Sequence, residues 1–117
     1  MRPLRDRPAQ VRPFNTGHAG DDARLEALSD TQPLSVPRRW SHFLHFPDEA
    51  TALLIAERLE PEWQTTVLPS PAGEGWTVQA LKDGVVVSPP AVTSTRTDFT
   101  ELAASLGGAY DGWQAWV

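Results

Sequence analysis

The apolar residues of two segments recur at the period of an α-helix. In residues 48–59 they are spaced i, i+3, i+4 and i+7, at Ala52, Ile55, Ala56 and Leu59. A second apolar stripe, in residues 98–106, comprises Phe99, Leu102, Ala103 and Leu106. One apolar stripe on an otherwise polar helix indicates that a single side packs against a hydrophobic core. The pattern therefore predicts two amphipathic helices, the first of which ends before Pro61.

The ends of the second helix carry their own signals. Asp98 and Glu101 have the spacing of a capping box, in which each side chain accepts a hydrogen bond from a free backbone amide. Gly107 and Gly108 follow the last apolar position, where a left-handed cap commonly ends a helix. We therefore expect this helix to begin at Asp98 and to end before Gly107.

Four segments have the composition of β-strands, since they are rich in aromatic and β-branched residues and are bounded by proline, glycine or other turn residues. They are residues 40–46, 63–68, 76–81 and 109–117. The second and third are expected to form a hairpin around a loop at 69–75. In the first, alternation places His42, Leu44 and Phe46 on one face and Ser41, Phe43 and His45 on the other.

Residues 82–84 (Lys-Asp-Gly) are typical of a tight turn. We therefore expect the third strand to end at Leu81, and residues 85–87 to fold back briefly before Pro89 and Pro90 interrupt the regular structure.

The start of the chain differs from the rest. Residues 1–20 contain three prolines and four arginines with few apolar residues, which predicts a flexible arm. A short helix is expected next, from Asp21 to Leu28, with the two acidic residues Asp21 and Asp22 at its positively polarised N-terminus.

The order of the remaining elements is strand, helix, strand, strand, helix, strand. This order predicts an α+β fold of the ferredoxin-like βαββαβ type: a four-stranded antiparallel sheet with two helices on one face. In that plan the first strand is central, between the third and the last. Residues 21–117 then form a single domain whose other sheet face stays open unless the arm, the short helix or a partner covers it.

Charge is distributed unevenly along the 117 residues, which have a formal net charge of −5. Residues 1–39 contain seven arginines and five acidic residues, whereas residues 40–117 contain three basic and ten acidic residues. An acidic domain repels phosphate and attracts basic protein segments. Residues 76–81 also lack the basic and aromatic pattern of RNA-recognition modules. We therefore expect a protein partner and no direct nucleic-acid binding.

Several classes of protein lack support in the sequence. There is no cysteine, so a disulfide framework, a thiolate metal site and a cysteine nucleophile are excluded. The serines lack the Gly-x-Ser-x-Gly pattern, and no phosphate-binding glycine loop occurs. His42 and His45 point to opposite faces of one strand and cannot easily share a metal. We expect no metal, no cofactor and no membrane segment, and a cytoplasmic location.

The last strand carries a specific motif. Residues 107–113 (Gly-Gly-Ala-Tyr-Asp-Gly-Trp) resemble the Gly-Gly-x-Tyr-Asp-Gly-Trp signature of the family called regulator of ribonuclease activity B, the ribonuclease E inhibitor proteins. Residues 37–48 resemble the opening strand of that family, with its Pro-Arg and His-x-x-x-Phe pattern, and Trp76 stands where its third strand begins. The resemblance covers about residues 21–117.

The resemblance implies a small acidic bacterial protein without catalytic activity. It would bind ribonuclease E through the partly basic, non-catalytic region of the nuclease and inhibit RNA cleavage. We expect such a protein to be a monomer or a weak homodimer. Two alternatives stay open: an immunity-type protein that neutralises a basic toxin, and a small enzyme that uses His42 or His45 with Asp111.

Five residues are candidates for a protein-binding site: His42, His45, Tyr110, Asp111 and Trp113. Tyrosine and tryptophan are frequent anchors of interfaces. The same motif also has a structural interpretation, in which Tyr110, Asp111 and Trp113 lock the last strand onto the first. In a regular strand Tyr110 and Trp113 lie on opposite faces, whereas a bulge at Gly112 would change this.

Overall fold

The computed structural model describes residues 14–71 and 73–116. These residues form the elements α1 (Ala19–Thr31), β1 (Arg38–Phe46), α2 (Glu49–Leu59), β2 (Gln64–Pro69), β3 (Trp76–Val85), α3 (Pro89–Ser105) and β4 (Ala109–Ala115). The predicted arm lies mostly in residues 1–13, outside the described residues. Its last two residues, Ala19 and Gly20, belong to α1, which is longer than the short helix expected from Asp21 to Leu28.

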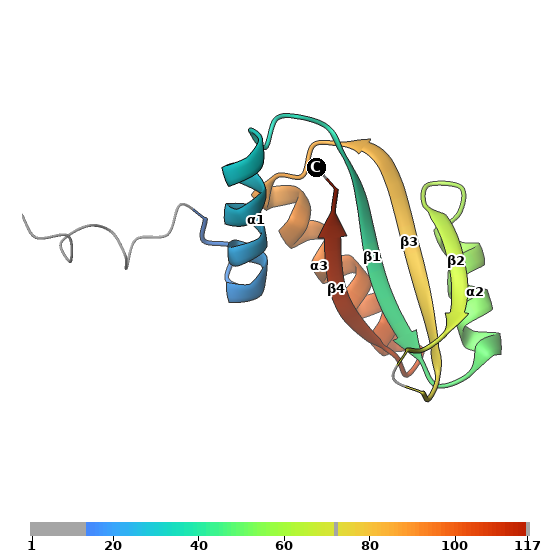
Figure 1. Ribbon diagram of the computed structural model, residues 1–117. Coiled ribbons are helices and arrows are strands. Elements are labelled where there is room, and N and C mark those ends of the chain that lie inside the picture. Colours follow the sequence, from blue (N-terminus) through green and yellow to red (C-terminus); the bar gives the residue numbers. More distant parts are fainter. Residues whose placement is uncertain (1–13, 72, 117) are drawn as a thin grey trace, which may run out of the picture.

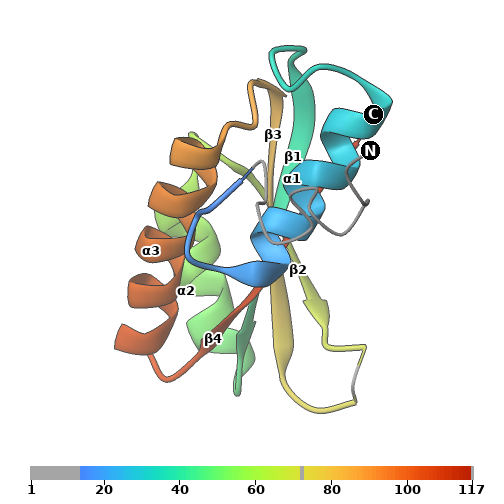
Figure 2. The same cartoon turned by 90° about the vertical axis from the view of Figure 1, so that its left-hand side faces the viewer.

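The four strands form one antiparallel sheet in the order β2-β3-β1-β4. Helices α2 and α3 cover one face of this sheet, and α1 lies beside β4 at its edge (Figures 1 and 2). The strand order, with β1 between β3 and β4, is that of a ferredoxin-like fold. The predicted α+β class and topology are therefore confirmed.

The alternation of β1 determines where the core forms. Trp40, His42, Leu44 and Phe46 face α2 and α3 and are buried, whereas Phe43 and His45 on the other face are only partly buried. The buried apolar side chains are Leu25, Leu28, Trp40, Leu44, Phe46, Ala52, Ile55, Ala56, Leu59, Trp63, Val78, Ala80, Val87, Val92, Phe99, Ala103 and Trp113. The apolar stripe predicted for α2 is the face that α2 buries.

The predicted turn at residues 82–84 is wrong, because β3 continues through them to Val85. Val85 pairs with Arg38 and Lys82 pairs with Trp40, so β3 has one residue more than β1 over this stretch. Residues typical of a turn are accommodated here as a β-bulge, which tolerates glycine inside a strand. The Asp83 carboxylate accepts a hydrogen bond of 2.6 Å from Arg39 Nε, which joins the bulge to β1.

The predicted start of the second amphipathic helix at Asp98 is also wrong. Helix α3 begins at Pro89, and the Ser88 side chain caps it by accepting a 3.2 Å hydrogen bond from the Ala91 amide. Proline is favoured in the first turn because its missing N–H would have no partner there. Pro89 and Pro90 therefore end the preceding strand and also start the helix.

The C-terminal end of α3 agrees with the sequence analysis. The Gly107 amide donates to the Ala104 carbonyl at 3.2 Å, and the Gly108 amide donates to the Ala103 carbonyl at 2.8 Å. These two bonds form a Schellman motif, which satisfies carbonyl groups that the end of a helix leaves free. The cap turns the chain directly into β4.

Candidate functional site

A buried carboxylate joins three elements that are distant in the sequence. Asp21 of α1 is 1% exposed. Its Oδ2 accepts from Arg96 Nε at 2.6 Å, and its Oδ1 accepts from Arg96 Nη2 and from Trp113 Nε1, both at 2.8 Å. Burial by itself raises the pKa of Asp21, but the hydrogen bonds from Arg96 and Trp113 outweigh it and hold the pKa below its ordinary value. Asp21 is therefore an ionised anchor between α1, α3 and β4.

The hydrogen-bonded pair His42 and Tyr110 lies next to this anchor. The Arg96 guanidinium lies 5.0 Å from the centre of the Tyr110 ring, and Tyr110 Oη is hydrogen-bonded to His42 Nδ1 at 2.7 Å. Burial lowers the pKa of His42 to about 3 and raises the pKa of Tyr110 above its ordinary value. Both side chains are consequently neutral at physiological pH. We call Asp21, Arg96, Trp113, Tyr110 and His42 the Asp21 cluster.

Aromatic rings enclose the His42 side chain. The ring centres of Trp63 and Phe99 lie 5.1 and 4.9 Å from that of His42, in edge-to-face arrangements. Such packing favours a neutral imidazole, because a charged ring here would lose its hydration. The position of His42 suits a structural role, and an exchange of protons with solvent is disfavoured.

A β-bulge in β4 brings Tyr110 and Trp113 to the same face. Gly112 pairs with Phe43 and Tyr110 pairs with Leu44, so Asp111 is an additional residue in β4. Gly112 has a φ of +111°, a backbone conformation that residues other than glycine rarely adopt. The bulge rotates the strand so that Tyr110 reaches His42 while Trp113 reaches Asp21. The Tyr-Asp-Gly-Trp sequence of residues 110–113 therefore determines which side chains meet on this face.

The structure does not bring the five candidate residues to one surface. His42 and Trp113 are buried in the Asp21 cluster, and Tyr110 is partly buried beside them. His45 lies on the open sheet face, where its Nε2 donates to the Glu74 carbonyl at 3.0 Å. Asp111 is exposed at the bulge. Within the described residues no hydrogen bond joins Asp111 to either histidine, so the pair on which the enzyme alternative depends is not assembled.

Two members of the Asp21 cluster were missed by the sequence analysis. Asp21 was interpreted only as an acidic residue at a helix start, and Arg96 was not considered. Arg96 could have been identified from its neighbours on α3, which are mostly apolar or small. An arginine in such surroundings needs a buried anion. Which anion it meets depends on the tertiary fold, because 75 residues separate Asp21 from Arg96.

The outer side of the helix layer is acidic and partly apolar. Glu49 and Glu57 of α2 and Asp98 and Glu101 of α3 are exposed. Leu53 and Leu54, also on α2, have exposed fractions of 52% and 42%. Over the part of the chain that the structure describes, none of the four carboxylates forms an ion pair, whereas Asp83 and Glu62 pair with Arg39 and Lys82. We call these four acidic residues with Leu53 and Leu54 the acidic helix surface.

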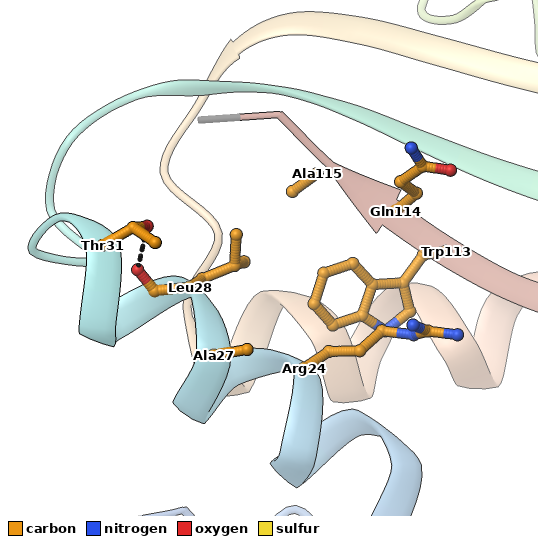
Figure 3. Close-up of a pocket in the computed structure, with 7 residues that line it drawn as sticks. All are labelled: Arg24, Ala27, Leu28, Thr31, Trp113, Gln114 and Ala115. Carbon is orange, nitrogen blue, oxygen red and sulfur yellow. Dashed lines mark hydrogen bonds between the residues drawn. The ribbon is translucent and has the colours of Figure 1, made fainter.

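A groove of about 250 Å³ lies between α1 and β4. Arg24 and Leu28 of α1 face Trp113 and Ala115 of β4 across it (Figure 3). Within residues 14–71 and 73–116, no three histidine, aspartate or glutamate side chains are grouped to hold a metal ion. No helix in the same residues has the length and apolar character needed to cross a membrane.

Comparison with known proteins identifies the family of this chain. No curated protein matches the chain. A family model described as regulator of ribonuclease activity B matches residues 19–115. This range begins at the first residue of α1 and ends at the last residue of β4, so it includes every element described above. The chain therefore belongs to the regulator of ribonuclease activity B family.

Proposed function

We propose that this protein is a non-catalytic regulator that binds a ribonuclease E-like enzyme and inhibits or modulates its cleavage of RNA. The observation that carries this proposal is the family match over residues 19–115. Regulation of ribonuclease activity is the function that the family implies. The identity of the nuclease, the mode of binding and the absence of catalysis are our inferences.

The arrangement of histidines supports a non-catalytic role. His42 is neutral and fully buried, and His45 and Asp111 share no hydrogen bond within the described residues. General acid–base catalysis needs a titratable group within reach of a substrate. The polar residues of the Asp21 cluster instead hold α1, α3 and β4 together.

The acidic helix surface is the docking site that we favour for the nuclease. Its four carboxylates attract a basic segment of the partner, and Leu53 and Leu54 offer apolar contacts inside that charged surrounding. Binding of this kind is expected to weaken as salt concentration rises, because exposed charges are screened.

We also propose that the partner contacts His45, Tyr110 and Asp111, because each keeps exposed surface near the β4 bulge. Asp111→Ala tests it. If Asp111 contacts the nuclease, affinity falls while thermal stability is retained. Loss of stability would support the structural interpretation of the motif.

Binding of the purified full-length chain to the purified ribonuclease E-like enzyme of the same organism, by isothermal titration calorimetry, tests the proposed docking site. The double variant Glu57→Lys/Glu101→Lys reverses two charges of the acidic helix surface. We expect affinity to fall by at least about fivefold, since each rim charge contributes up to about 1 kcal/mol. The matched control Glu26→Lys/Asp30→Lys makes the same change in charge at exposed positions of α1, outside this surface.

The outcomes separate the candidate functions. Equal loss of affinity in the double variant and its control would mean that only net charge matters, and the docking site would be wrong. No binding by the wild-type chain would refute the ribonuclease proposal. An immunity-type role would then be the next candidate, because an acidic surface also suits a basic toxin.

A further inference from the structure

The residues that precede α1 are held at a fixed place beside α3. The Thr16 amide and hydroxyl both donate to Asp22 Oδ1, at 2.9 and 2.8 Å, and Phe14 packs against the core. Asn15 and Thr16 line a groove together with four residues from the start of α3, which are Pro89, Pro90, Thr93 and Ser94 (Figure 2). Residues 1–13 therefore join the fold next to the N-terminal end of α3. We call them the arginine segment.

An exposed stripe of α3 leads from this groove to the acidic helix surface. Pro90, Ser94, Thr97 and Glu101 are spaced i, i+4, i+7 and i+11, which places them in one line along a helix, and all four are exposed. Asp98 is exposed beside this line. With a rise of about 1.5 Å per residue, Glu101 lies only about 11 Å beyond Ser94 along the helix axis.

The arginine segment is long enough to reach both helices of this surface. An extended chain spans at most about 3.3–3.6 Å per residue, so the residues before Phe14 reach up to about 45 Å. Packed helices lie about 8–10 Å apart, so α2 is only slightly farther away than α3. Arg7, which is seven residues before Phe14, can therefore approach the carboxylates of either helix.

The charges of the arginine segment and the acidic helix surface are opposite. Residues 1–13 contain four arginines and one aspartate. Within the described residues, the four carboxylates of the surface form no ion pair, whereas Asp21, Glu62 and Asp83 already have basic partners. An arginine can bind a carboxylate through two parallel hydrogen bonds. The surface therefore offers the arginine segment free acidic partners close to the point where the segment joins the fold.

We propose that the arginine segment lies across the acidic helix surface of its own chain and competes there with the basic segment of the nuclease. A tethered segment acts at an effective concentration on the order of millimolar, so ion pairs that are weak one by one suffice. Their weakness also allows a partner that binds more tightly to displace the segment. The competition rests on the proposed function, whereas the position of the segment depends on this chain alone.

A spin label on the arginine segment tests its position without the nuclease. The chain has no cysteine, so Leu4→Cys provides a single site for a nitroxide. In NMR spectra of the full-length chain, we expect the label to broaden the amide signals of Asp98 and Glu101 more strongly than those of Glu26 and Asp30. The latter belong to α1, which an unattached segment would also reach. A salt concentration of about 0.5 M should remove the difference, because exposed charges are screened.

Two charge variants of the labelled chain identify the contact. Glu57→Lys/Glu101→Lys should abolish the stronger broadening at Asp98, because it reverses two charges of the surface. The matched control Glu26→Lys/Asp30→Lys should leave it unchanged. Equal broadening of α1 and α3, or broadening at Asp98 that survives Glu57→Lys/Glu101→Lys, would overturn the inference.

Isothermal titration calorimetry with the ribonuclease E-like enzyme tests the competition. In one variant, Gln replaces Arg at positions 2, 5, 7 and 12 of the full-length chain. If the segment covers the surface about four fifths of the time, its release raises the affinity for the nuclease about fivefold. This gain should disappear when the same four changes are made in the Glu57→Lys/Glu101→Lys chain.

The calorimetric outcomes are distinct from those of the nuclease proposal itself. A gain that persists in the Glu57→Lys/Glu101→Lys chain would show an effect of net charge alone and would overturn the competition, as would unchanged or lower affinity of the variant with four glutamines. If the wild-type chain and this variant both fail to bind the nuclease, the proposed function and the competition fall together. The NMR result then still decides whether the arginine segment lies on the acidic helix surface.

Discussion

Burial of neutral His42 makes the free energy of unfolding depend on pH. One substitution, His42→Asn, separates this dependence from that of all other groups. In the unfolded chain this histidine takes up a proton near its ordinary pKa of 6.5, whereas in the fold burial lowers the pKa to about 3. The stabilising contribution is therefore fully present above pH 6.5 and is lost as pH falls toward 3. Well inside that interval each pH unit costs about 1.4 kcal/mol. Lowering the pH from 6.5 to 4.5 removes roughly 2 kcal/mol, because about half of the unfolded chains already carry the proton at pH 6.5.

Protonation of His42 is unfavourable in the fold because of the groups that surround its imidazole ring. Trp63 and Phe99 pack edge-on against His42, and no carboxylate in residues 14–71 or 73–116 is hydrogen-bonded to it. The charge of Asp21 acts in the opposite direction but is outweighed by burial, while Arg96 and Lys82 add to the effect. A loss of roughly 2 kcal/mol is a substantial part of the about 5–15 kcal/mol that stabilises a typical domain.

Urea unfolding followed by tryptophan fluorescence measures the effect, with His42→Asn as the reference. Asparagine does not titrate, and its amide can take the place of Nδ1 beside Tyr110. We expect the wild type to lose roughly 2 kcal/mol more than the variant between pH 6.5 and 4.5. Groups common to both proteins cancel in this difference. An equal loss in the two proteins would refute the assignment of His42 as a buried neutral residue.

Three further substitutions test the packing around β4. Asp21→Asn leaves Arg96 without its carboxylate partner and should lower the free energy of unfolding by about 3 kcal/mol in urea titration; an unchanged midpoint would show that the cluster is not an anchor. Tyr110→Phe removes the hydrogen bond to His42 Nδ1 and should cost about 1–2 kcal/mol by thermal unfolding, whereas a stabilised variant would contradict that bond. Gly108→Ala brings a Cβ against the His45 carbonyl and should lower the free energy of unfolding by about 2 kcal/mol or more. A variant with the wild-type melting temperature would show that Gly108 does not lie this close to β1.

Local patterns sufficed to predict most of the fold. The apolar stripe of residues 48–59 and the alternation of His42, Leu44 and Phe46 depend on neighbours in the sequence, and both are confirmed. The two incorrect boundaries have a shared reason. Each segment is compatible with more than one local structure. Pairing with β1 selects a strand for residues 82–84, whereas the Ser88 cap makes Pro89 the start of a helix.

The candidate site was less predictable because its partners are far apart in the sequence. Asp21 and Trp113 are 92 residues apart, and no periodicity relates them. The bulge at Gly112 was anticipated as a condition for bringing Tyr110 and Trp113 together, since glycine inside a strand is unfavourable without such a purpose. Which side chains they would meet required the placement of α1 against β4.

Regulation of ribonuclease activity is tested most directly by a cleavage assay with purified components. The ribonuclease E-like enzyme of the same organism is given a fluorescent single-stranded RNA substrate and increasing concentrations of this protein. Our account predicts a saturable decrease in cleavage rate. The variant Glu57→Lys/Glu101→Lys shifts this decrease to higher concentration, and the control Glu26→Lys/Asp30→Lys does not. A cleavage rate unchanged by saturating wild-type protein would contradict it.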